Sequence, residues 1–199
     1  MKKLKHLPNA CGLDEAGRGP LAGPVAAAAV ILPKKFNLAG INDSKQLDRQ
    51  TREDLEKRIK THALWSVVLV HHEEVDSLNI FWASMAAMER AYAALGIHDG
   101  PVLVDGNRVP NKLTGRGEAV IKGDATWACI AAASILAKTA RDRYMVEISD
   151  SYPGYGFEKH FGYPTPEHFM ALHELGPCPI HRRSFAPVAA REQGVLIFE

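Results

Sequence analysis

The chain has 199 residues, a length that suits one domain with a sizeable core. Apolar residues make up 46% and charged residues 24%, and 24 Lys and Arg against 23 Asp and Glu leave a net charge of +1, which neither requires nor excludes a polyanionic partner. No uncharged apolar run reaches transmembrane length, and the basic N-terminus lacks a signal-peptide core, so we expect a cytoplasmic protein without a membrane partner.

The first half of the chain alternates predicted strands and helices. Apolar runs bounded by turn residues predict the strands, and amphipathic spacing predicts the helices. The predicted strands are 10–16, 24–32 and 63–70, and the predicted helices are 48–62 and 73–95. The segment GRGPLAG forms the turn between the first two strands, and Gly96 is a natural C-cap for the second helix.

The second half continues the alternation. The predicted elements are strands at 101–107 and 118–124, and an Ala-rich helix from about 127 to 148. Residues 151–168 are predicted to form a loop rich in Gly, Pro and Tyr, and Thr165 caps the helix that follows, with Pro166 at its first position. Three early strands followed by alternating helices and strands predict an α/β fold, a mixed sheet covered by helices.

Carboxylates stand where predicted buried strands end. Asp14 and Glu15 close CGLDE, Asp105 closes PVLVD, and Asp124 begins the long helix after the strand AVIK. Two adjacent buried carboxylates repel each other, and both can reach one site only if their strand ends there. Together the four could hold two divalent cations, which take oxygen ligands and offset the repulsion. Each one taken alone is also explained as a turn residue or a helix N-cap.

The widely spaced cysteines, Cys11, Cys129 and Cys178, indicate reduced buried thiols. An odd number in mostly apolar surroundings is typical neither of a disulfide framework nor of a zinc site.

Several motifs in order resemble the ribonuclease HII family: GLDEAGRGPLAGPVAAAAVIL, NDSKQL, VDGN, KGD, IAAASILAKTARDR, YGFEKHFGYPT and HRRSF. The resemblance covers roughly residues 9–188. It implies an RNase H-like fold, a mixed central sheet flanked by helices with a helical C-terminal region. We expect a single domain over 1–199, with a catalytic core of about 9–150 and a helical and loop region of about 151–199.

The resemblance also implies an activity. Such an enzyme hydrolyses the RNA strand of RNA–DNA hybrids and incises DNA on the 5′ side of embedded ribonucleotides, using Mn²⁺ or Mg²⁺ and leaving 5′-phosphate and 3′-hydroxyl ends. The implied catalytic metal ligands are Asp14, Glu15, Asp105 and Asp124. The implied residues that recognise the ribonucleotide are Gly17, Arg18, Gly19 and Tyr163. Phe161 stands where the family usually has Lys.

Further residues are candidates for binding phosphate or moving protons. Ser44 and Lys45 lie in a polar loop, and Ser134, Lys138 and Arg141 share one face of the long helix. The histidines His160, His168 and His181 are expected to have ordinary roles rather than to transfer protons. Arg182 and Arg183, in HRRSF, are expected to be structural.

Two other classes of function remain open at this point. An aspartate-based phosphotransferase would need a second Asp that LDEAG lacks, and a non-catalytic nucleic-acid-binding module would not explain the acids. The GxGxxxG spacing with Pro20 fails the dinucleotide fingerprint. We expect a monomer.

The tail REQGVLIFE lies beyond the resemblance. Its apolar residues, from Val195 to Phe198, are predicted to pack back on the domain as a strand or cap. Alternatively Gln193, Leu196 and Phe198 form a Q-x-x-L-x-F peptide of the kind that docks on a sliding clamp.

Overall fold

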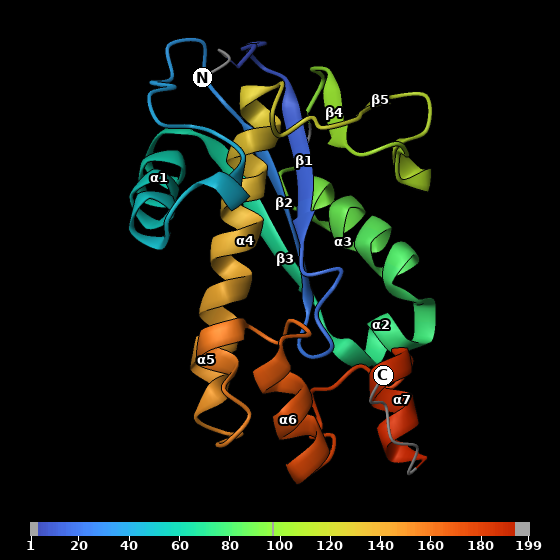
Figure 1. The fold of residues 1–199 in the computed structure, drawn as a ribbon. Helices are drawn as coiled ribbons and strands as arrows, with labels where there is room; N and C mark the ends of the chain where they lie inside the picture. Colours follow the sequence, from blue (N-terminus) through green and yellow to red (C-terminus); the bar gives the residue numbers. More distant parts are fainter. Residues whose placement is uncertain (1–3, 97, 194–199) are drawn as a thin grey trace.

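The computed structural model describes residues 4–96 and 98–193, which form a five-stranded mixed sheet in the order β3-β2-β1-β4-β5 (Figure 1). The strands are β1 (Cys11–Ala16), β2 (Val25–Ile31), β3 (Leu64–Val70), β4 (Val102–Asp105) and β5 (Gly117–Val120). β2 pairs antiparallel with β1 and β3, whereas β4 pairs parallel with β1 and β5. The predicted mixed sheet is confirmed.

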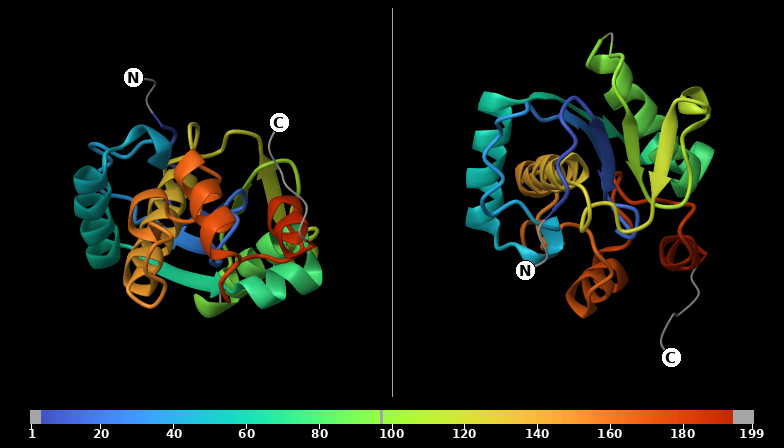
Figure 2. Two further views of the ribbon diagram at one scale, coloured as in Figure 1. Left: turned by 60° about the horizontal axis from the view of Figure 1, so that its bottom comes forward. Right: turned by 90° about the horizontal axis from the view of Figure 1, so that it is seen from above.

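Helices cover both faces of this sheet. They are α1 (Arg49–His62), α2 (His72–Leu78), α3 (Ile80–Ala94), α4 (Ala128–Ser149), α5 (Phe157–His160), α6 (Pro166–Leu175) and α7 (Ala186–Glu192). The short 3-10 turns are η1 (Ser44–Gln46) and η2 (Asn111–Leu113). α4 packs on one face of β1 and β2 with α1 outside it, and α3 packs on the opposite face (Figure 2). In the part of the chain that the structure describes, no helix combines the length and apolarity needed to cross a membrane.

The close approach of α4 to β1 depends on Gly12. A Cβ atom at this position would lie only 2.2 Å from the backbone carbonyl carbon of Cys129, in the first turn of α4. The neighbouring side chains, Cys11 and Leu13, point to the other face and join the core beneath α3. This alternation lets the long helix lie directly on the central strand, which brings the side chains of α4 close to the end of β1.

The predicted helix over 73–95 is wrong in one respect, because two helices occupy the segment. The break falls at Asn79, whose φ is +64°. Its side chain accepts hydrogen bonds from the N–H groups of Phe81 and Trp82, at 3.0 and 3.2 Å, and so caps α3. Asn is enriched among non-Gly residues at positive φ and also caps a helix well.

The predicted helix from about 127 to 148 is confirmed, but the predicted 118–124 strand and the position of Asp124 need correction. β5 ends at Val120, and α4 begins only at Ala128. Asp124 therefore lies in the intervening turn and does not begin the helix. The C-terminal elements depart less from expectation, since the Thr165 cap and Pro166 are confirmed, while the predicted 151–168 loop contains the short helix α5.

The C-terminal helices gather at one end of the sheet (Figure 1), beside the loop formed by residues 17–24. Backbone hydrogen bonds join this loop to two later segments, from Leu21 N–H to the Gly162 carbonyl at 2.8 Å and from Gly23 N–H to the Ile180 carbonyl at 2.9 Å. The three cysteines are free and buried, as predicted. Residues 194–199, which include most of the predicted clamp peptide, lie outside the described residues.

We expect Gly12→Ala to lower the free energy of unfolding by about 3 kcal/mol, because the new methyl group would overlap the backbone of α4. Urea unfolding followed by circular dichroism measures the loss. Gly96→Ala is the control, since Gly96 has a φ of +86° but no heavy atom within 4 Å of the added Cβ, so that only backbone strain of about 1 kcal/mol is expected. Equal losses in the two variants would contradict the proposed helix–strand crowding.

Candidate active site

Asp14 and Glu15 lie where β1 extends beyond its neighbour β4. The parallel pairing of β4 covers only residues 11–13 of β1, so this edge of β1 is open from Asp14 onward. β1 ends at Ala16, directly after the acidic pair, as predicted. β4 ends beside it at Asp105, and both adjacent carboxylates line one cavity.

This cavity, of about 250 Å³, is lined by the four carboxylates and by most of the other residues that the sequence singled out as site candidates. Its lining comes from β1 and the loop after it, η1, the end of β4, the turn before α4, α4 itself and the loop after α5. The lining residues are Asp14, Glu15, Ala16, Gly17, Arg18, Gly19, Ser44, Lys45, Asp105, Asp124, Ser134, Lys138 and Tyr163. Segments far apart in the sequence thus meet at a single place.

Asp14 is the most buried of the four carboxylates, with 5% of its surface exposed. Its Oδ1 accepts a hydrogen bond from the Glu15 N–H at 2.7 Å, and the Ser134 hydroxyl supplies a second. Burial nevertheless raises the pKa of Asp14 well above its usual range, and the negative charges of Glu15 and Asp105 raise it further. Among the described residues, no Lys or Arg forms an ion pair with Asp14 that would offset this burial.

The other three carboxylates are less buried than Asp14, and each has an interaction partner in the structure. Burial raises the pKa of Glu15, while Arg18, 3.5 Å away, counteracts this. Asp105 accepts a hydrogen bond from the Gly123 N–H at 2.7 Å through one oxygen. Asp124 accepts one from the Ala125 N–H at 2.9 Å, and burial followed by repulsion from Asp105 raises its pKa.

The donor set fits a hard divalent cation. The four carboxylates offer only oxygen ligands, which Mg²⁺ and Mn²⁺ prefer, and a cation would remove the repulsion that raises the Asp14 pKa. Within residues 4–96 and 98–193, no three His, Cys, Asp or Glu side chains already stand close enough to enclose an ion. The carboxylates lie around the cavity wall, as expected for like charges without a counterion.

Lys138 supplies positive charge on the α4 side of the cavity. Its Nζ lies 2.7 Å from Asp142 Oδ1, one turn further along the helix. The same ammonium group lies 5.2 Å from the ring centres of Phe161 and Tyr163. Phe161, at the position where the resemblance led us to expect Lys, therefore packs beside a lysine that α4 provides.

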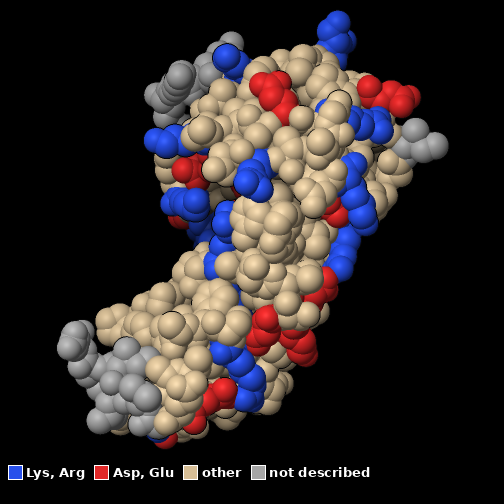
Figure 3. All heavy atoms as spheres, turned by 90° about the vertical axis from the view of Figure 1, so that its right-hand side faces the viewer, with Lys and Arg blue, Asp and Glu red and all other residues tan. Residues whose placement is uncertain are grey.

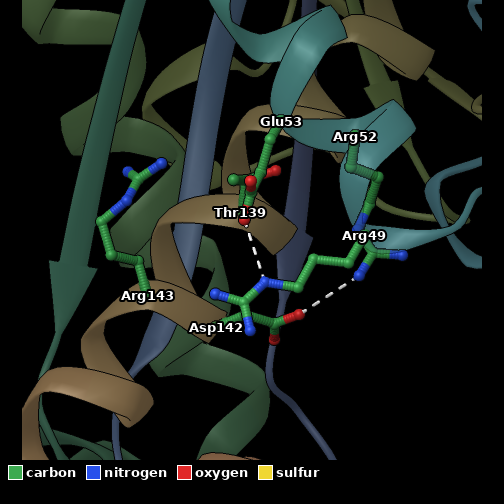
Figure 4. A pocket seen from close by; sticks show the side chains of 6 residues that line it. All are labelled: Arg49, Arg52, Glu53, Thr139, Asp142 and Arg143. Carbon is green, nitrogen blue, oxygen red and sulfur yellow. Dashed lines mark hydrogen bonds and ion pairs between the residues drawn. The ribbon is translucent and has the colours of Figure 1, made fainter.

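Asp142 also connects Lys138 to the turn η1. Its Oδ2 lies 3.6 Å from Arg52 Nη2, an ion pair drawn in Figure 4. Arg52 in turn donates to the carbonyls of Leu47 and Ser44, at 2.5 and 3.3 Å, and so holds the turn that carries Ser44 and Lys45. The sequence analysis missed Asp142 and Arg52, although the i, i+4 spacing of Lys138 and Asp142 was a usable signal.

The turn η1 and α4 also meet through a hydroxyl pair. Ser44 Oγ and Ser134 Oγ lie 2.9 Å apart, and both side chains are buried. Because Ser134 also hydrogen-bonds Asp14, the pair joins the turn, the helix and the carboxylate in one network.

Gly19 and Tyr163 face each other at another part of the cavity. A Cβ atom on Gly19 would lie 3.9 Å from Cε1 of Tyr163 and would meet nothing else within 4 Å. Gly17, with a φ of +99°, has no such room, since a Cβ atom there would lie 2.2 Å from Nε of Arg141. Gly17 is therefore needed for packing and backbone conformation, and Gly19 keeps the space in front of the tyrosine free.

Two groups of candidates do not take part in the cavity. Arg141 was predicted to share the phosphate-binding face of α4, but it is fully buried and donates to backbone carbonyls, so that prediction is wrong. The three histidines are buried in the C-terminal region instead, where burial lowers the pKa of His168 to about 4 and that of His181 to about 3. Nε2 of His168 lies 3.0 Å from Nε2 of His181, so these two side chains belong to the packing of the C-terminal region.

Comparison with known proteins gives a consistent result. The family model described as ribonuclease HII matches residues 11–188. The ribonuclease HII of Dechloromonas aromatica (strain RCB) is 56% identical over 180 residues, which cover 90% of this chain and 91% of that protein. The ribonuclease HII of Idiomarina loihiensis is 53% identical over 179 residues, with coverages of 89% and 95%.

Solved structures agree with the sequence relatives. The ribonuclease H2 of Pyrococcus horikoshii OT3 superposes with a TM-score of 0.80 at 27% identity, over 93% of this chain and 97% of that one. The ribonuclease HII of Archaeoglobus fulgidus, in a complex with PCNA, gives 0.75 at 26% identity, with coverages of 87% and 91%. Bst-RNase HIII in complex with Mn²⁺ shares the fold, with a TM-score of 0.72 at 17% identity and coverages of 92% and 69%.

These matches decide against the aspartate-based phosphotransferase and the non-catalytic binding module, and they confirm the RNase H-like fold. The chain belongs to the ribonuclease HII family and is a ribonuclease H endonuclease.

Proposed function

We propose that this enzyme hydrolyses the RNA strand of RNA–DNA hybrids and incises DNA on the 5′ side of embedded ribonucleotides, with Mn²⁺ or Mg²⁺ as cofactor and with 5′-phosphate and 3′-hydroxyl ends as products. The observation that carries the proposal is the convergence of four carboxylates, a lysine held beside two aromatic rings, and the Gly19–Tyr163 gap in one cavity. Family membership supports the reaction class.

Asp14, Glu15, Asp105 and Asp124 would hold two divalent cations. Bound there, such cations supply an activated water and neutralise the departing 3′-oxygen. The unpartnered charge of Asp14 supports this assignment, and so does the Mn²⁺ in the related Bst-RNase HIII structure. The four residues thereby act as catalytic metal ligands, and no Ser, Cys or His nucleophile is required.

Ser44, Lys45, Ser134 and Lys138 bind the phosphates on the sides of the cavity. Lys138 suits this role because its pairing with Asp142 fixes the ammonium group at the cavity while leaving further N–H donors free. Ser44 and Ser134 offer hydroxyl groups that are already held by their mutual hydrogen bond. The face drawn in Figure 3 carries Lys, Arg, Asp and Glu side chains interspersed, without one large basic patch. The cations placed at the cavity, Lys45 and Lys138, therefore support substrate binding.

The backbone of residues 17–19 and the ring of Tyr163 recognise the ribonucleotide. A protein distinguishes RNA from DNA through the 2′-hydroxyl, and backbone without a side chain can approach the sugar closely. Gly19 leaves such room directly in front of Tyr163, whose phenol can hydrogen-bond the hydroxyl while its ring packs on the sugar. Arg18, with its side chain half exposed, pairs with Glu15 at the same edge.

The proposed function is tested by Asp105→Asn. We expect cleavage of a duplex carrying one ribonucleotide in Mg²⁺ to fall by about 10³-fold or more, because a charge needed at the reacting phosphate is lost. Binding to the same duplex should stay within about threefold. Asp99→Asn is the control, since Asp99 is an almost fully exposed carboxylate outside the cavity. Full cleavage by Asp105→Asn, or products other than 5′-phosphate and 3′-hydroxyl ends, would overturn the proposal.

A second prediction follows from the raised pKa of Asp14. Since the pKa of Asp14 in the folded state lies above its ordinary value, the fold loses stability as the pH rises from that ordinary value through the folded-state pKa. In EDTA at pH 8 we expect Asp14→Asn to melt higher than wild type by a few degrees, at about 2–4 °C per kcal/mol in a chain of this size. The advantage should shrink toward pH 4.

The matched control for the melting experiment is Asp142→Asn. Asp142 is paired with Lys138 and Arg52, so its neutralisation should lower the melting temperature. A lower melting temperature for Asp14→Asn at pH 8 in EDTA would contradict the assignment of Asp14 as a carboxylate that lacks a counterion.

We also propose that the C-terminal peptide containing Gln193, Leu196 and Phe198 docks on a sliding clamp. The Q-x-x-L-x-F pattern in the sequence supports this, and so does the solved complex of the Archaeoglobus fulgidus relative with PCNA. Docking would raise the local enzyme concentration at newly replicated DNA, in which misincorporated ribonucleotides arise.

Deletion of residues 192–199 tests this docking. We expect the full chain to bind the clamp of its own organism in surface plasmon resonance, and the truncated chain to lose binding while keeping its melting temperature within about 2 °C. The double variant Leu196→Ala, Phe198→Ala should behave like the deletion. A large drop in melting temperature would favour a tail that packs on the domain, and absence of clamp binding by the full chain would rule docking out.

A further inference from the structure

Arg141 of α4 and Arg182, in the segment before α7, are buried guanidinium groups without acidic partners. Both have 0% exposed surface, and they are the largest fully buried side chains among the described residues. Neither forms an ion pair within the part of the chain that the structure describes. Burial lowers the pKa of Arg182 to about 9 and that of Arg141 to about 10. Buried charges of this kind are costly, so the fold must gain something else from their N–H donors.

Arg182 donates only to backbone carbonyls of the loop formed by residues 17–24. Its Nη2 donates to Gly17 and Pro24 at 2.7 and 3.0 Å, its Nε to Gly23 at 2.9 Å, and its Nη1 to Arg18 at 3.2 Å. One planar group thus contacts both ends of the loop. The fork of donors in a guanidinium makes this possible, and an ammonium group could not reach four acceptors spread in this way.

Arg141 connects the same loop to the segment that carries Tyr163. Its Nε donates to the Pro24 carbonyl at 2.9 Å and its Nη2 to that of Ala22 at 3.0 Å. Its Nη1 donates to the Phe161 carbonyl at 2.9 Å, and its guanidinium carbon lies 5.6 Å from the ring centre of Tyr163. Arg141 therefore sets the distance between the loop and the tyrosine.

The two side chains also determine which backbone groups the loop presents. The carbonyls of Gly17 and Arg18 are drawn inward to Arg182. Within residues 4–96 and 98–193, the N–H groups of Arg18 and Gly19 donate to no protein acceptor, and both residues line the cavity. The loop thus keeps its acceptors occupied beneath it and its donors free beside the cavity.

We propose that Arg141 and Arg182 are positioning residues for ribonucleotide recognition, which hold residues 17–19 and Tyr163 at a fixed separation so that the slot for the 2′-hydroxyl exists before substrate binds. This inference rests on the proposed function, in which that loop and tyrosine recognise the sugar. A preformed slot keeps the reacting phosphate in line with the carboxylates once the duplex is bound.

Arg182→Lys tests the inference, since it keeps the charge and removes the fork. For a duplex with a single ribonucleotide we expect kcat to fall about 10²-fold, because a misplacement of about 1 Å at the reacting bond has an effect of this size. The Kd for the same duplex should stay within about threefold, since the arginine touches no substrate. Arg141→Lys should give the same split between kcat and Kd, and it carries the test if Arg182→Lys does not fold.

Two controls separate positioning from simple loss of stability. Arg191→Lys makes the same chemical change at an arginine that also donates to carbonyls, those of Leu172 and His173, but at α6. Ile59→Ala removes a fully buried side chain in α1, away from the loop, and supplies a variant of lowered melting temperature. Both controls should keep kcat within about threefold at a temperature at which all variants are folded.

Tyr163→Ala in the same assay separates failure of this inference from failure of the proposed function. If Tyr163→Ala loses kcat while folded Arg182→Lys and Arg141→Lys keep it within threefold, the positioning role is wrong and the proposed function stands. If the Ile59→Ala control loses as much kcat as the arginine variants, the positioning role is also wrong. If Tyr163→Ala keeps full kcat, the recognition role of Tyr163 is wrong and the positioning role falls with it, while the proposed cleavage itself stands or falls with Asp105→Asn.

Discussion

Repulsion among Asp14, Glu15 and Asp105 is the constraint that the rest of this structure must satisfy. Like charges at a buried edge favour local separation or unfolding, and a flexible chain would move them apart. Here the carboxylates are fixed to β1 and β4, two central strands of one sheet, and α4 lies directly on β1 because Gly12 has no side chain. The rigid sheet holds the charges together, and in the proposed function this arrangement would attract a divalent cation without a rearrangement of the strands.

Positive charge is arranged in two layers around this acidic centre. The first layer faces the cavity and consists of Lys45, Lys138 and Arg18. The second lies beneath the loop of residues 17–24, where Arg141 and Arg182 donate only to carbonyls. The first layer can bind anions directly, whereas the second shapes the backbone. In the proposed function the first layer binds substrate and the second sets the geometry of the loop, although both layers contain arginine.

The sequence predicted the sheet, the long helices and the gathering of the acids well, because these features follow from apolar periodicity and from motifs with fixed spacing. It failed where one side chain changes the backbone path, as at Asn79, which breaks the 73–95 helix by adopting a positive φ. It also failed for Arg141, since i, i+7 spacing puts a residue on a helix face without telling whether solvent or another segment covers that face. Burial of this kind depends on residues 22–24 and 161, which only the tertiary structure brings to the helix.

The hydrogen bonds of Arg182 can form only late in the synthesis of the chain. Arg182 lies 165 residues from Gly17 in the sequence, so the carbonyls of the loop gain these donors only after nearly the whole chain described here has been synthesised. A nuclease whose loop depends on a late residue assembles its recognition slot only once the chain has reached that residue, and the growing polypeptide before that point lacks the finished slot.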